Sequence, residues 1–334
     1  MKKVFSAVVA FFMLLLCGCS ALTTSLELMS TPTPTPYPTQ TARQIDISQK
    51  SIAVLLPGAT ESWVHAAQYY AQEALAQLGA QYNIMFADNP QLQSEQIQQT
   101  ITDAYDVVIL LPVDASVAES AKSITKAGLG LILFDRKLAS ANETCFVCVD
   151  NAAIGKYAAE YTIEKLEGNG KIAIIGVPGA GAQNTQRIDA FKNGIAAASD
   201  GEIEILQEFA ATAASSEQGK TIWNSILALY PDVNAVFTTD DSLALGVYQQ
   251  ASSAGHALKL IMGVGASQNS LNTMSTSVIE LGTLSNSPKE IVRCVEAAQK
   301  LILEGALKDK TITYPTQLVT KSNVQEFLNP QSIY

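Results

Sequence analysis

From residue 51 to residue 303, short apolar runs of strand length alternate with longer segments whose apolar residues have helical spacing. Apolar runs of four to eight residues bounded by turn residues are typical of buried strands, and a repeat every three to four residues is typical of helices. Strands are predicted at 51–57, 82–86, 107–111, 129–134, 171–176, 204–209, 235–238, 258–264 and 278–284. Helices are predicted at 62–78, 92–104, 116–127, 154–166, 187–198, 217–229, 243–253 and 288–303.

This alternation predicts an α/β fold in which helices cover both faces of parallel sheets. With the extended apolar segment at 144–150, at least ten strands are expected, which fit two sheets better than one. A chain of 334 residues also exceeds what one hydrophobic core usually organises, so two domains are expected. Ligands of such folds bind beyond the carboxyl ends of the strands. Residues that directly follow strands are therefore the candidates for function.

The N-terminal segment has the features of an export signal. Positively charged residues at 2 and 3 precede an apolar run of 13 residues at 4–16, which is short for a membrane span and typical of a signal peptide. The run ends in Leu16-Cys17-Gly18-Cys19, which resembles a bacterial lipobox, although Ala or Ser is usual at the position of Cys17. We expect a signal peptide at 1–18 and a lipid on Cys19. The alternative is an ordinary secretory signal with incidental cysteines.

Residues 31–40 read TPTPTPYPTQ, and this segment predicts a tether. Each proline removes a backbone donor and fixes φ, so the segment favours an extended conformation over helix or inner strand. We expect residues 19–47 to separate the lipid from the globular chain, with the protein outside the cell and anchored to its membrane.

Charge and composition exclude several classes of function. The chain has 21 basic and 31 acidic residues, a net charge of −10, which disfavours nucleic acid as a partner. Only two histidines are present, His65 and His256, so a multi-histidine metal centre is not expected. No nucleophile, base and acid occur in a recognisable motif, and we expect a protein without catalytic residues, metal or cofactor.

Two motifs have alternative interpretations. Cys145 and Cys148 have CxxC spacing, but residues three apart on a strand point to opposite faces. We expect buried thiols there and at Cys294, with a strained disulfide or half of a zinc site as the alternative. The glycines at 176–181 follow a predicted strand but do not match GxGxxG, since Asn184 stands where the third glycine should be. A flexible strand-to-helix loop is the expected structure.

Charged pairs directly follow two predicted strands. Asp135-Arg136 follows the strand at 129–134 and offers both acceptors and a fork of donors, so it is a candidate ligand contact. Asp240-Asp241 follows the strand at 235–238. Asp241 is expected to cap the next helix, and Asp240 to face the cleft.

Several motifs together resemble the type 1 periplasmic binding proteins of the ribose- and galactose-binding kind. The resemblance covers 51 to about 319, and its most specific part is AVFTTDDSLALG at 235–246. The other matching segments are FDR at 134–136, VDN at 149–151, KIAIIG at 171–176, Arg187 and Phe191, LIMGVG at 260–265, GTLSNSP at 282–288 and YPT at 314–316.

The resemblance implies two Rossmann-like lobes joined by a three-strand hinge that close on a ligand. The chain would cross between the lobes near Asp150, Asn286 and Thr316. One lobe would comprise 48–149 plus 287–316, and the other 150–286 plus 317–334.

The resemblance also implies a set of ligand contacts. These are Glu61, Trp63, Asp135, Arg136, Asp240 and Asn286, together with Gln183 and Asn184 near the position of a usual arginine. Three positions depart from the family pattern. Leu111 stands where a polar contact is usual, Thr185 near the usual arginine, and Gly265 where an aspartate commonly follows the strand. The ligand is therefore expected to be a small polar molecule, most simply a sugar, and a polyol or non-sugar is the alternative.

The implied function is capture of this ligand outside the cell and delivery to the permease subunits of a membrane ABC importer, by a monomeric lipoprotein. The alternative is a ligand-sensing receptor that signals to a membrane kinase or chemoreceptor.

Overall fold

The computed structural model describes residues 46–58, 62–198 and 202–334. The predicted signal peptide, Cys19 and almost all of the predicted tether fall outside these ranges, as does Glu61. The described chain begins with the 3-10 helix η1 (Ile47–Gln49), which Asp46 caps by accepting a hydrogen bond from the backbone N of Ser48. Within the described ranges, no helix is both long enough and apolar enough to cross a bilayer.

The first lobe is built on a six-stranded sheet with the order β11-β5-β4-β3-β1-β2. All of its strand pairs are parallel. Its strands are β1 (Ser51–Pro57), β2 (Gln81–Ala87), β3 (Val107–Leu110), β4 (Gly130–Phe134), β5 (Cys145–Val149) and β11 (Thr311–Tyr314). Its helices are α1 (Ser62–Leu78), α2 (Pro90–Thr102), η2 (Ala115–Val117), α3 (Ala118–Lys126), η4 (Pro288–Ile291) and α9 (Val292–Glu304).

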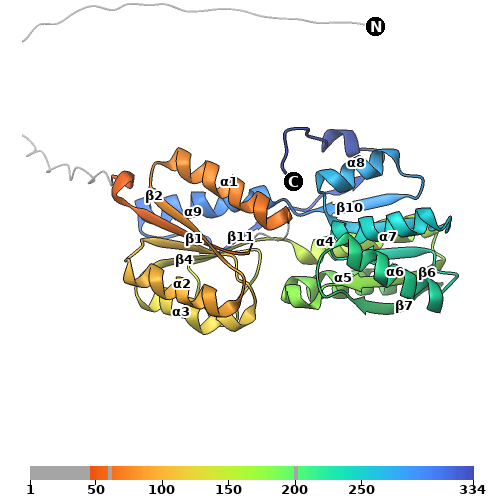
Figure 1. The fold of residues 1–334 in the computed structure, drawn as a ribbon, viewed down its shortest axis with the longest axis horizontal. Coiled ribbons are helices and arrows are strands. Elements are labelled where there is room, and N and C mark those ends of the chain that lie inside the picture. Colours follow the sequence, from red (N-terminus) through yellow and green to blue (C-terminus); the bar gives the residue numbers. More distant parts are fainter. Residues whose placement is uncertain (1–45, 59–61, 199–201) are drawn as a thin grey trace, which may run out of the picture. The chain divides into compact units, whose positions relative to one another are not determined.

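The residues of β1 alternate between two cores. Ile52, Val54 and Leu56 pack with apolar residues of α1 and α9, whereas Ala53 and Leu55 pack with those of α2 and α3. Figure 1 shows α1 and α9 on one side of this sheet and α2 and α3 on the other. Successive side chains of a strand point to opposite faces, so a strand covered on both faces is apolar throughout.

The second lobe has a sheet with the order β12-β10-β9-β8-β6-β7. Its strands are parallel except that β12 pairs with β10 in the antiparallel direction. They are β6 (Gly170–Gly176), β7 (Ile203–Ala210), β8 (Ala235–Thr238), β9 (Leu260–Gly265), β10 (Leu281–Ser285) and β12 (Leu318–Thr320). The helices are α4 (Asn151–Leu166), η3 (Pro178–Ala180), α5 (Ala182–Ala198), α6 (Ser216–Leu229), α7 (Asp241–Ser253), α8 (Gln268–Thr276) and η5 (Val324–Glu326).

The chain passes between the two sheets at three places. These are between β5 and α4, between β10 and η4, and between β11 and β12. The predicted two-sheet α/β architecture is thus confirmed. The lobe boundaries 48–149 plus 287–316 and 150–286 plus 317–334 stay a prediction, which this arrangement of the sheets supports.

Some elements differ from the sequence prediction. The pattern predicted neither α8 nor β11 and β12, because α8 is rich in polar residues and the two strands have only four and three residues. Helix α5 begins at Ala182 rather than at residue 187. Its first turn is polar and therefore lacks the apolar repeat that marks a helix, yet this turn forms part of the site.

The three described cysteines are free and buried. Cys145 and Cys148 both lie on β5, and Cys294 lies on α9. Burial raises the pKa of Cys148 to about 11, so its thiol stays protonated near neutral pH.

Candidate ligand-binding site

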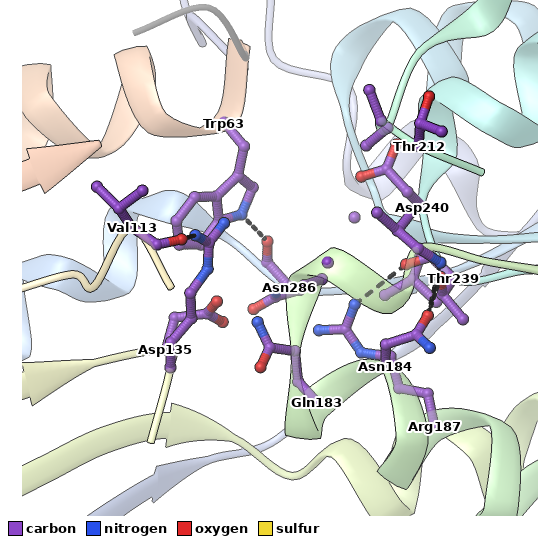
Figure 2. Close-up of a pocket in the computed structure, with 18 of the residues that line it drawn as sticks. Trp63, Val113, Asp135, Gln183, Asn184, Arg187, Thr212, Thr239, Asp240 and Asn286 are labelled. Carbon is purple, nitrogen blue, oxygen red and sulfur yellow. Dashed lines mark hydrogen bonds between the residues drawn. The ribbon is translucent and has the colours of Figure 1, made fainter. Parts of the chain in front are cut away.

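A cavity of about 260 Å³ lies where the carboxyl ends of β4, β6, β8 and β9 meet the start of α1. Figure 2 shows Trp63, Val113 and Asp135 on one side of the cavity and Thr212, Thr239 and Asp240 on the other. Its lining residues are Trp63, Val113, Asp135, Arg136, Val177, Gly179, Ala180, Gln183, Asn184, Arg187, Thr212, Ala213, Ala214, Thr239, Asp240, Val264, Gly265, Asn286 and Tyr334. Residues after the strands thus dominate the lining, as the strand-end rule predicts.

Trp63 lies in the first turn of α1 and is fixed by two contacts. Its ring stacks on Phe134 with the centroids 5.5 Å apart and an interplanar angle of 16°. Its Nε1 donates a hydrogen bond of 2.8 Å to the backbone oxygen of Asn286 (Figure 2). Because the indole N–H is used within the protein, Trp63 can offer a ligand an apolar ring surface in a fixed position.

Asp135 and Arg136 follow β4 and leave two buried polar atoms without a partner. Asp135 has a positive φ of 58° and is 8% exposed. Among the described residues, neither Oδ1 of Asp135 nor Nε of Arg136 has a hydrogen-bond partner. Nη1 of Arg136 donates to the carbonyl oxygens of Pro112 and Val113, each at 3.0 Å. A buried polar atom without a partner costs about 1–3 kcal/mol, so these two atoms are unfavourably placed beside the cavity that Asp135 and Arg136 line.

Helix α5 contributes one polar face to the cavity. Gln183, Asn184 and Arg187 are all buried and line the cavity, because residues three and four apart share a helix face. Asn184 Oδ1 accepts hydrogen bonds from the backbone N of Val177 at 2.7 Å and from Oγ1 of Thr239 at 3.0 Å. These bonds hold the first turn of α5 against the ends of β6 and β8.

Arg187 is a buried cation within this site. Its Nε donates to Oδ1 of Asn151 at 2.8 Å, and its Nη1 donates to the backbone oxygen of Thr239 at 3.1 Å. Burial lowers the pKa of Arg187, whereas the negative charges of Asp135 and Asp240 favour its charged form. The guanidinium is therefore held by the second lobe and interacts electrostatically with carboxylates on both sides of the cavity.

Asp240 lies at the cavity as expected, whereas Asp241 does not have the expected role. Asp240 is the N-cap of α7, since its Oδ1 accepts a hydrogen bond of 2.7 Å from the backbone N of Ser242, and it also lines the cavity. Asp241 does not cap the helix. It is 1% exposed and accepts hydrogen bonds from Oγ1 of Thr283 at 2.6 Å and from the backbone N of Ser267 at 2.8 Å. The expectation that Asp241 is the cap was wrong, because α7 already begins at Asp241 and the cap position therefore falls on the residue before it, Asp240.

Asn286 connects the cavity to both lobes. Its Oδ1 accepts a hydrogen bond of 2.9 Å from the hydroxyl of Tyr314, and its backbone N donates to the oxygen of Gly265 at 3.3 Å. These contacts use the oxygen of the amide side chain, so its N–H donors are the part that a ligand hydroxyl can use.

A family profile described as "Periplasmic binding protein domain" matches residues 52–306, which is more than half of the chain. The protein belongs to this family of periplasmic binding proteins. The match confirms the resemblance that the sequence motifs indicated.

Named relatives and solved structures agree with this assignment. The ribose import binding protein of Bacillus subtilis (strain 168) is 27% identical over 231 residues, which cover 69% of this chain and 73% of the relative. The xylitol-binding protein of Mycolicibacterium smegmatis is 24% identical over 233 residues, covering 70% of this chain and 66% of the relative. A solute-binding protein from Bacillus halodurans C-125, solved with myo-inositol, has a TM-score of 0.78 at 21% identity and covers 86% of this chain and 99% of its own.

Seven of the eight predicted contacts of this periplasmic binding protein line the cavity, and the eighth, Glu61, lies outside the described residues. The structure also shows where the three residues that depart from the family pattern lie. Leu111 is fully buried in the core and Thr185 does not line the cavity, whereas Gly265 does. Sequence reasoning missed Arg187 as a cavity residue. Arg187 follows Asn184 by three residues and Gln183 by four, so all three share one helix face. This spacing could have identified Arg187 as a cavity residue.

Asp241 gives the binding protein a distinctive pH dependence. Burial raises the pKa of Asp241 from 3.8 to about 6. The folded state therefore binds this proton more tightly than the unfolded state, and the contribution of Asp241 to the free energy of unfolding falls as pH rises from about 4 to about 6. We expect Asp241→Asn to remove this fall, because asparagine does not titrate. The free energy of unfolding of the variant, relative to that of the wild type, should therefore rise by up to about 3 kcal/mol between about pH 4 and about pH 6.

Urea denaturation at pH 4, 5, 6 and 7 measures this difference. Asp114→Asn is the matched control, because it makes the same chemical change at an exposed cap, that of η2. An equal pH profile for Asp241→Asn and the wild type would show that the carboxyl does not titrate in this range.

Proposed function

We propose that the protein captures a small, uncharged polyhydroxy ligand such as a sugar or cyclitol outside the cell and delivers it to a membrane ABC importer. The proposal includes a monomeric lipoprotein anchored through Cys19, with Glu61, Trp63, Asp135, Arg136, Gln183, Asn184, Asp240 and Asn286 in contact with the ligand.

The chemistry of the cavity is the observation that carries this proposal. Two carboxylates, Asp135 and Asp240, and two guanidinium groups, Arg136 and Arg187, line it together. Their formal charges cancel, which favours a ligand without net charge. Ligand hydroxyls both donate and accept, so one polyol can bond to carboxylate and guanidinium groups at the same time.

The size of the cavity and its aromatic side chain agree with a single ring. A cavity of about 260 Å³ admits a single-ring ligand, and the ring of Trp63 gives this ligand an apolar surface for stacking.

The relatives favour an importer over a ligand-sensing receptor. Ribose import binding proteins from Bacillus subtilis and Escherichia coli are among the proteins to which the chain is similar, at 27% and 25% identity. Uptake of a labelled ligand by cells with and without the gene distinguishes the two roles, because loss of the receptor alone leaves uptake intact.

A thermal-shift screen tests the ligand class. The panel holds D-ribose, D-allose, xylitol and myo-inositol, with amino acids and sugar phosphates as charged or zwitterionic comparisons. A ligand at 100 times its Kd adds about 2.7 kcal/mol to the free energy of unfolding, which raises Tm by several degrees. Stabilisation by a neutral polyol supports the proposal, and stabilisation by the charged compounds alone contradicts it.

Lipid attachment has its own test. Cys19→Ser should abolish incorporation of a labelled fatty acid, because the thiol of Cys19 is the proposed acceptor of the lipid. Two acyl chains give stable membrane attachment, so the variant should also leave the membrane fraction or stay unprocessed. Cys17→Ser is the control and should keep the label. Label retained in Cys19→Ser would rule out this anchor.

A further inference from the structure

Strand β9 ends at the cavity in a glycine, Gly265, whose φ is 144°. This backbone conformation favours glycine over residues with a side chain. A Cβ atom added to Gly265 would stand 2.5 Å from Oη of Tyr334 and 3.1 Å from Oδ2 of Asp241. The space that a side chain at position 265 would take is therefore already occupied by the phenol of Tyr334.

Tyr334 is held in place by hydrogen bonds that lead back to α8. The side chain of Gln268 donates to the oxygen of Phe327 at 3.1 Å and accepts from the backbone N of Asn329 at 2.9 Å. The backbone N of Ser332 donates to the oxygen of Asn329 at 2.9 Å, and Oγ of Ser332 donates to the oxygen of Tyr334 at 2.7 Å. The segment after η5 thus brings Tyr334 to the end of β9.

A second cavity of about 410 Å³ lies beyond this wall, lined among others by Tyr70, Lys289 and Arg293. Gly265 and Tyr334 are the two described residues that line both cavities. Since Gly265 has no side chain, Tyr334 is the one of these two residues whose side chain can separate the two spaces.

We propose that Tyr334 is a specificity-determining residue of the ligand site, where its ring limits the ligand to the first cavity and its hydroxyl supplies the polar group on the wall at Gly265. The inference rests on the proposed function. A phenol hydroxyl both donates and accepts, which suits a ligand hydroxyl. The ring excludes ligands that extend toward the second cavity, so the site selects single-ring polyols over disaccharides.

Tyr334→Phe tests the hydroxyl without changing the shape of the wall. Against whichever of D-ribose, D-allose, xylitol and myo-inositol binds the wild type best, Kd should rise about 2- to 13-fold, the loss of one neutral hydrogen bond. Ile333→Ala is the control, because Ile333 lies in the same segment, is exposed and lines neither cavity. Calorimetric titration with equal Kd values for Tyr334→Phe and the wild type would overturn the role of the hydroxyl.

Tyr334→Ala tests the ring. The variant joins the two cavities, so the ratio of disaccharide to monosaccharide affinity, measured with sucrose and maltose against the same probe, should rise at least about 10-fold. If this affinity ratio is unchanged in a Tyr334→Ala variant with the Tm of the wild type, the ring of Tyr334 does not limit the ligand to the first cavity. If Tyr334→Ala fails to fold, Tyr334→Phe decides alone. If the wild-type protein binds none of the neutral polyols, the proposed function itself is contradicted. If the wild type binds one of them and both Tyr334 variants bind with unchanged affinity and selectivity, only this inference is contradicted.

Discussion

Replacing Arg136 with alanine should weaken binding of the preferred sugar by about 10- to 150-fold. Arg136 lines the cavity, and a charge-assisted hydrogen bond from its guanidinium to a ligand contributes about 1.5–3 kcal/mol. The fold should change little, because Arg136 follows a strand at the edge of the cavity and, among the described residues, its Nη1 bonds only to the carbonyl oxygens of the neighbouring loop residues Pro112 and Val113.

Lys137→Ala is the matched control for Arg136→Ala. Lys137 is the next residue along the chain and also carries a positive charge, but it pairs with Glu143 at the surface and does not line the cavity. Calorimetric titration should give the control a wild-type Kd. If Arg136→Ala binds as tightly as Lys137→Ala, the ligand does not contact this guanidinium.

Arg187→Met should lower both the stability of the protein and its affinity for the ligand. The change leaves the oxygens of Asn151 and Thr239 without their buried donor and removes the cation that interacts with Asp135 and Asp240. Removing one member of such a buried polar cluster costs about 3–5 kcal/mol of unfolding free energy. Affinity should fall by at least about 10-fold, because a cavity lined by two carboxylates and one guanidinium no longer has balanced charge.

Chemical denaturation and ligand titration measure the two effects separately. Arg293→Met is the control, since Arg293 forms an exposed ion pair with Glu290 on the first lobe and should cost less than about 1 kcal/mol. Similar losses of stability in both variants would mean that the guanidinium of Arg187 does not stabilise the fold through its buried contacts.

The fold could be predicted to a large extent because each strand is covered on both faces. A strand such as β1 is then apolar throughout, and the predicted range 51–57 equals the observed one. Short or polar elements lack this signal. In β11 the four residues alternate in burial, and in α8 most residues are polar, so neither stands out from a loop.

The site could be predicted only where a residue directly follows a strand or where the family pattern is intact. Asp135 and Asp240 follow apolar runs, so the strand-end rule placed both at the cavity. Arg187 lies just after the first turn of α5. This turn is polar, so the apolar repeat did not mark the true start of the helix, and Arg187 was not placed at the cavity. Tyr334 lies 69 residues after Gly265 in the sequence (334 − 265), and no local pattern connects the two residues.

A crystal structure of the protein with its preferred sugar tests the central claim most directly. The claim is that the cavity lined by Trp63, Asp135, Arg136 and Asp240 holds a neutral single-ring polyol. We predict density for one ring in this cavity, with one face against Trp63 and with oxygens within hydrogen-bond distance of the Asp135 carboxylate and the Arg136 guanidinium. A ligand bound elsewhere, or bound here without contact to either of these two groups, would contradict the claim.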